Sequence, residues 1–137
     1  MIRKSDPIDF PAGLPGFETH RQFNLESRSD MRPFLLLRSM NDSDVALPLI
    51  DCQLLRASAR PELTDSAAKL LGAKDAGDVA PFFILKVDAD SGTITANTKA
   101  PILITAENSQ GFQVILDSRE LKVDEPLTNL LPEAKGS

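Results

Sequence analysis

The chain has 137 residues, which is enough for one domain with a core of its own. Its formal net charge is -5, and its aromatic residues amount to 5% and are all phenylalanine. This composition argues against direct nucleic-acid binding, because phosphates need clustered basic side chains and unpaired bases stack on exposed rings. A single cysteine excludes an intrachain disulfide, and with only one histidine beside it a Cys/His zinc site is excluded as well.

No targeting or membrane segment is expected. Residues 1–7 carry two positive charges without the apolar run that would follow them in a signal peptide. No apolar stretch approaches the length of a membrane-spanning helix. We therefore expect a cytoplasmic protein without membrane contact.

The N-terminal region combines short strands with a loop rich in proline and glycine. Residues 8–10 alternate and can end a strand, and residues 21–25 alternate as a second one. Pro15-Gly16 is typical of the centre of a type II turn, and Leu14 and Phe17 are expected to anchor the loop. A glycine-rich phosphate cradle is the alternative for residues 11–16, but the Gly-Lys-Ser/Thr ending and the following helix are absent.

A β-hairpin is predicted next. The polar loop of residues 26–32 leads into an apolar strand over residues 33–37, and residues 41–44 form a tight polar turn. Residues 45–50 are the partner strand. Pro48 in its interior predicts a sheet edge or a bulge at that point, because proline has no N–H to donate.

One short helix is predicted over residues 65–71. Thr64 suits the N-cap, Asp65 complements the positive end of the helix, and Gly72 suits the position after its end. We expect the buried stripe to consist of Leu63, Ala67, Leu70 and Leu71.

The second half of the chain is a succession of apolar strands. Residues 79–87 form a strand that turns at residues 88–92 into the stretch 93–116, where apolar runs at 102–104 and 114–116 predict buried strands. The predicted hairpin loop is 108–111, with Gly111 at a positive φ and Asn108 bonded to its own backbone.

Eight or nine short strands with one helix favour an all-β, mainly antiparallel fold, a small β-barrel-like single domain. We assign residues 1–125 to this domain and residues 126–137 to a mobile C-terminal tail.

No residues suggest catalysis, a metal site or a cofactor site. Residues 88–92 resemble the start of a calcium loop but lack the later ligands, so a hairpin turn is favoured. The neighbouring acids at 42 and 44, 88 and 90, and 124 and 125 lie in predicted turns, where no apolar pocket would raise a pKa for acid–base work. Cys52 has no base placed beside it, so we expect an inert packed thiol, and we expect His20 to be a solvated loop residue.

Several segments taken together resemble the FliW family of flagellar assembly factors. The first is Phe-Pro-Ala-Gly-Leu-Pro-Gly-Phe-Glu at 10–18, followed by Pro-Phe-Leu at 33–35. The later ones are Thr-Ala-Asn-Thr-Lys-Ala-Pro-Ile at 95–102, Gly-Phe-Gln-Val-Ile-Leu at 111–116 and Pro-Leu at 126–127. These segments occur in the family's order and cover most of the chain.

The resemblance implies a non-enzymatic β-barrel-like domain that binds flagellin in the cytoplasm. It also implies binding to CsrA, an RNA-binding translational repressor, which keeps CsrA off flagellin mRNA. An acidic protein that holds a basic RNA-binding regulator agrees with the net charge of this chain.

We expect partner contacts at exposed acids and at the bend of residues 97–101. The candidates are Asp42, Asp44, Asp51, Glu62, Asn97, Lys99 and Pro101. For Lys99, an exposed charge that blocks sheet-to-sheet pairing is the alternative role. For the whole chain, the alternative function is a small β-barrel that binds a small molecule, which would require an apolar pocket with convergent polar groups.

Overall fold

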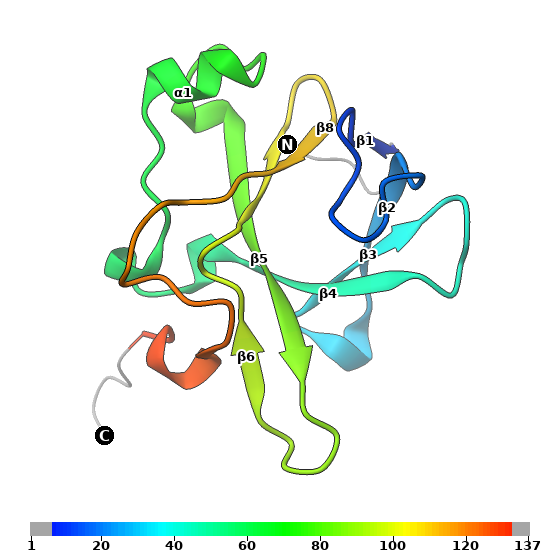
Figure 1. Ribbon diagram of the computed structural model, residues 1–137, viewed down its shortest axis with the longest axis vertical. Helices are drawn as coiled ribbons and strands as arrows, with labels where there is room; N and C mark the ends of the chain where they lie inside the picture. The colour runs from blue at the N-terminus through cyan, green and yellow to red at the C-terminus, as the bar shows by residue number, and fades with distance from the viewer. Residues whose placement is uncertain (1–6, 133–137) are drawn as a thin grey trace.

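The computed structural model describes residues 7–132, and nine strands form its framework (Figure 1). The strands are β1 (Ile8–Asp9), β2 (Gln22–Ser27), β3 (Leu35–Ser39), β4 (Ala46–Asp51), β5 (Val79–Val87), β6 (Ile94–Ala96), β7 (Ile102–Thr105), β8 (Gln110–Gln113) and β9 (Glu125–Pro126). The α-helix of the described region is α1 (Asp65–Leu70). Single 3-10 turns lie at Ser29–Met31, Cys52–Leu54, Ala57–Ala59, Ala76–Asp78 and Leu127–Asn129.

The strands close into a ring. Their order is β4-β3-β2-β1-β8-β7-β5, and β5 pairs with β4 again, while β6 and β9 continue from the lower half of β5. All pairs are antiparallel except β1 with β8. Closure leaves few free edges, as expected for small all-β proteins. The predicted fold class is confirmed.

Apolar side chains fill the interior of the ring. Nine buried residues form this cluster: Ile8, Phe10, Leu14, Phe23, Leu37, Leu49, Phe82, Ile102 and Ile104. Among residues 7–132, these side chains occupy the centre of the ring, so its interior is a packed core and not a ligand chamber. The alternative function, a β-barrel that binds a small molecule in its interior, is therefore not supported.

Strand β7 is buried on both faces, as its uninterrupted apolar run predicts. Ile102 and Ile104 belong to the interior cluster, whereas Leu103 packs on the outer face with Ala68 and Val79. Helix α1 thus covers the outside of the ring next to β7.

The proline- and glycine-rich loop forms the predicted type II turn. Gly16 has φ +85°, and the N–H of Phe17 donates to the carbonyl of Leu14 at 2.8 Å. Leu14 is 2% exposed, so it anchors the loop to the core.

The first predicted hairpin is confirmed with a small change. The N–H of Val45 closes the turn onto the carbonyl of Asp42 at 3.0 Å. Pro48 pairs with Leu36 of β3, but β4 joins β5 only from Leu49 onward, so Pro48 lies at an open edge as predicted. The loop before β3 is shifted by two residues from its predicted position, because β2 continues to Ser27 along β3 and β3 begins only at Leu35.

Helix α1 begins and ends where its caps predict. The hydroxyl of Thr64 accepts the N–H of Ala67 at 3.1 Å, and Gly72 follows the helix with φ +86°. The predicted buried stripe is wrong at Leu70, which is 88% exposed. Ala68 is the fully buried residue, and Leu70 lies about 200° around the helix axis from it.

The hairpin formed by β7 and β8 is shifted from its predicted position. Thr105 pairs with Gln110, so the loop is 106–109, and Ser109 has the positive φ of 50°. Gly111 lies inside β8 instead, against the ring of Phe10. Asn108 donates to the carbonyl of Gly72 at 3.0 Å and not to its own backbone.

Strand β8 ends at Gln113, earlier than the apolar run 114–116 predicts. The opposite residue for Val114 is Pro101, which has no N–H. The N–H groups of Lys99 and Ala100 instead donate to Oδ1 of Asn97, at 3.2 and 3.1 Å. Residues 114–116 therefore donate backbone hydrogen bonds to residues 99–101 but receive none in return.

The chain returns to the sheet after residue 124. Strand β9 pairs with β6, and Leu127 and Leu130 are buried in a second cluster with Phe83 and Leu85. Much of the stretch assigned to a tail thus packs on the domain, and residues 133–137 of that prediction lie outside the described residues.

Candidate interaction surface

Cys52 and His20, the two residues considered for nucleophilic chemistry, lie apart in the structure. Cys52 is fully buried, and burial raises the pKa of its thiol far above the usual range, with a further increase from the Asp51 carboxylate. Arg60 opposes this shift more weakly. Within residues 7–132 no cluster of three metal-ligating side chains occurs.

His20 is held more firmly than a solvated loop residue. Its Nδ1 lies 2.7 Å from the hydroxyl of Ser39, and its ring packs edge-on against Phe17. The imidazole therefore fastens the loop before β2 to the end of β3. His20 lies at the turn end of the β3–β4 hairpin, whereas Cys52 lies at the open end of the same hairpin.

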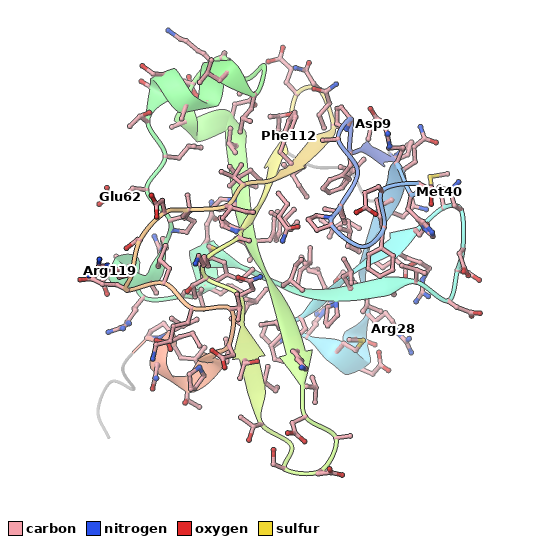
Figure 2. The ribbon with its side chains drawn as sticks, in the orientation of Figure 1. Asp9, Arg28, Met40, Glu62, Phe112 and Arg119 are labelled. Atoms are coloured by element: carbon pink, nitrogen blue, oxygen red, sulfur yellow. The ribbon has the colours of Figure 1, made fainter. Side chains whose placement is uncertain are left out.

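The structure separates the acidic candidates. Asp42 and Asp44 are exposed in the β3–β4 turn, where Oδ1 of Asp42 accepts the N–H of Asp44 at 3.0 Å. Figure 2 shows Met40 at the start of this turn on one side of the molecule and Glu62 on the other. These acids therefore cannot form one compact contact with Glu62.

Asp51 is half-buried at the end of β4. Its Oδ1 accepts the N–H of Gln53 at 2.9 Å and caps the 3-10 turn that follows. It also lines a shallow hollow of about 340 Å³ together with Leu25, Leu35 and Asp78. Oδ2 of Asp78 is buried and has no hydrogen-bond partner within residues 7–132.

The bend at residues 97–101 is ordered by local hydrogen bonds. Asn97 is half-buried and caps the bend through Oδ1, whereas Lys99 is exposed as predicted. Pro101 is buried, so its predicted exposure is wrong. Its ring instead forms part of the wall of an apolar hollow.

Two adjoining hollows among residues 7–132 form a concave surface, which we call the groove. The apolar hollow has a volume of about 240 Å³ and lies between α1 and residues 114–116. The second has a volume of about 670 Å³ and extends towards residues 117–125. Pro61, Glu62 and Leu116 line both hollows, which makes the groove continuous.

The side chains of the apolar hollow come from four separate parts of the chain, at residues 61–71, 81, 101–103 and 114–116. They are Pro61, Leu63, Ala67, Leu70, Leu71, Pro81, Pro101, Leu103, Val114 and Leu116, with Glu62 at the rim. Among the predicted contacts, only Glu62 and Pro101 belong to it. The sequence gives a signal for two further lining residues, Leu70 and Leu116, because both stand in apolar patterns. Those patterns, however, predict core positions and not the wall of a surface hollow.

Comparison with known proteins identifies the family. The model of the family described as FliW protein matches residues 1–127. The chain belongs to the FliW family. The flagellar assembly factor FliW of Thermosipho africanus is 34% identical over 128 residues, which cover 93% of this chain and 88% of that protein. The one of Caldanaerobacter subterraneus is 32% identical over 133 residues, covering 96% and 88%.

A solved structure supports the same assignment. The crystal structure of a flagellar assembly factor FliW superimposes with a TM-score of 0.79 at 32% identity, over 97% of this chain and 91% of that one. FliW proteins are assembly factors, which confirms the prediction that the chain is not an enzyme. In residues 7–132, none of the helices has the length and apolar character needed to cross a bilayer.

Proposed function

We propose that this chain binds flagellin in the cytoplasm and also binds CsrA, so that CsrA no longer represses translation of flagellin mRNA. The observation that carries this proposal is membership of the FliW family over nearly the whole chain. Both partners are proteins, and an assembly factor can act on them by binding.

The charge of the chain supports a basic partner. The formal net charge is -5, and acidic side chains are exposed on several faces of the ring. An RNA-binding repressor must present basic side chains to the phosphates of its RNA. Opposite charge accelerates encounter between two such proteins and helps to orient them.

Four of the seven predicted contact residues are exposed in two separate places. Asp42 and Asp44 are exposed on the β3–β4 turn. Glu62 is exposed at the rim of the groove, and the exposed Lys99 accepts through its carbonyl the N–H of Leu116, which lines the groove. Two separate surfaces would allow flagellin and CsrA to be bound at different places. Charge reversal at one surface should then affect one partner more than the other.

A competition titration tests the proposal. The full chain is added to a preformed complex of CsrA and the flagellin mRNA leader from the same organism, with and without flagellin present. We expect the chain to reduce repression by CsrA in a coupled translation assay, and we expect added flagellin to restore repression. Absence of micromolar affinity for both proteins would refute the proposal.

Two variants make the titration specific to a surface. Glu62→Lys and Asp44→Lys each change the net charge by the same amount. Figure 2 shows Glu62 on one side of the molecule and, on the other, Met40 at the start of the β3–β4 turn to which Asp44 belongs. If only the overall charge matters, both variants weaken CsrA binding equally. If a defined surface matters, one of them weakens it clearly more than the other.

A further inference from the structure

The wall of the apolar hollow is open to solvent. Leu70 lines the hollow from α1 and is 88% exposed, and Leu71 and Leu116, which also line it, are only half-buried. In Figure 1, α1 lies above the segment that follows β8, and both border the hollow. Apolar side chains that are exposed together around a hollow are typical of a protein-binding surface.

The adjoining hollow of the groove is acidic. Its lining contains four carboxylates, those of Glu62, Asp117, Glu120 and Glu125, and two guanidinium groups, those of Arg56 and Arg60. None of the four carboxylates forms an ion pair with another residue between 7 and 132. The guanidinium of Arg60 already donates to the carbonyls of Gln53 and Leu55. The lining therefore has an excess of negative charge that nothing within the described chain neutralises.

The loop on this side of the groove is acidic as a whole. Residues 117–125 contain four acidic side chains and two basic ones, Arg119 and Lys122. Neither basic residue is among the described residues that line the hollow. Figure 2 shows Arg119 on the same side of the molecule as Glu62. A cation that approaches the hollow therefore meets more carboxylates than basic groups.

We propose that the groove is the surface that binds CsrA. An apolar side chain of CsrA enters the hollow beside Leu70, and lysine or arginine side chains of CsrA lie along the carboxylates. This inference rests on the proposed function, because CsrA is one of the two partners proposed. An apolar pocket that is filled at the centre of an interface supplies affinity, and complementary charge around it supplies orientation and specificity.

The charge of the groove favours CsrA over other occupants. An RNA-binding repressor must carry clustered basic side chains, because it binds the phosphates of RNA. The proposed role of flagellin sets no such requirement on its surface. A second copy of this chain fits less well, because a protein with a net charge of -5 would face an acidic groove.

A substitution at Leu70 tests the apolar half of the groove. Leu70→Ser removes an exposed side chain that lines the hollow. Val87→Ser is the matched control, because Val87 is 57% exposed at the end of β5 and is not among the described residues lining either hollow. Calorimetry with purified CsrA from the same organism should show about tenfold weaker binding for Leu70→Ser and a change within about threefold for Val87→Ser.

A charge reversal at Glu62 tests the acidic half. Glu62→Lys acts where the two hollows meet, whereas Asp90→Lys makes the same change of net charge in the exposed turn between β5 and β6. We expect Glu62→Lys to weaken CsrA binding about tenfold and Asp90→Lys to stay within about threefold. Raising the salt concentration from about 0.1 M to about 1 M should weaken binding of the original chain more than binding of Glu62→Lys.

The same variants are then titrated with flagellin, and circular dichroism confirms that each is folded. Affinity for flagellin should stay within about threefold for both groove variants. If the original chain binds CsrA and either groove variant matches its control, the groove proposal is overturned and the proposed function stands. The groove proposal is also overturned if the groove variants weaken flagellin as much as CsrA. If the original chain binds neither protein, both proposals fall.

Discussion

Replacement of Gly111 by alanine should destabilise the whole ring. A Cβ atom built on Gly111 would lie 2.3, 2.5 and 2.7 Å from three carbons of the Phe10 ring. Ordinary van der Waals contact between carbons needs about 3.5–4.0 Å. The ring of Phe10 would therefore have to move by about 1 Å or more.

The surroundings of Phe10 resist such a movement. Phe10 is fully buried and packs edge-on against Phe23 with ring centroids 5.2 Å apart. Protein cores are as densely packed as organic crystals, so a displaced ring must push its neighbours in turn. Overpacking of this kind costs about 1–3 kcal/mol, and we expect about 3 kcal/mol because the contact is so short. For a domain of this size the expected fall in Tm is about 10 °C.

Urea unfolding followed by far-UV circular dichroism measures this effect, since the chain has no Trp or Tyr for fluorescence. The matched control is Gly77→Ala, because the added Cβ would meet only the side-chain oxygen of Asp75, at 3.3 Å. We expect the control to change stability by less than about 0.5 kcal/mol.

A double-mutant cycle decides whether the contact is the cause. Phe10→Leu shortens the opposing side chain, so Gly111→Ala should cost clearly less in the Phe10→Leu background than in the original chain. The reasoning is refuted if Gly111→Ala leaves the urea midpoint unchanged. It is also refuted if the two substitutions destabilise additively.

Three further predictions follow from single residues. Thr64→Ala should cost about 1 kcal/mol of unfolding free energy in urea titrations through loss of the N-cap bond to Ala67, whereas Thr64→Ser should retain most of it. Cys52 should not react with a thiol reagent at pH 8 until denaturant is added, because burial raises the pKa of its thiol, and rapid reaction of the folded chain would contradict this. Asn97→Ala should cost about 1–3 kcal/mol, because it leaves the N–H groups of Lys99 and Ala100 without Oδ1, and Asn97→Asp should keep most of the stability in the same titration.

Local sequence patterns predict the elements that are determined locally. Strand β5 covers the predicted residues 79–87, and Thr64 and Gly72 limit α1 as their capping preferences require. The type II turn at Pro15-Gly16 is likewise set by the conformational preferences of two adjacent residues. In these cases the residues that determine the structure are neighbours in the chain.

The remaining errors come from contacts between distant residues. Gly111 looks like a turn residue, but its lack of a side chain is required by Phe10, about a hundred positions earlier. Leu70 fits an apolar pattern, yet α1 packs on Leu103 and Val79 through the side that carries Ala68, and Leu70 lies on the opposite side. The groove is lined by residues spread between positions 56 and 130, so no window of sequence contains it.

The bend between β6 and β7 explains why β8 ends where it does. Asn97 takes the N–H groups of Lys99 and Ala100, and Pro101 has none, so this side can only accept hydrogen bonds from residues 114–116. Because residues 99–101 accept hydrogen bonds but donate none back, residues 114–116 do not continue β8 as a regular strand. The side chain of Ile115 is exposed. The end of β8 is therefore determined by Asn97 and Pro101, which are more than ten positions earlier in the chain.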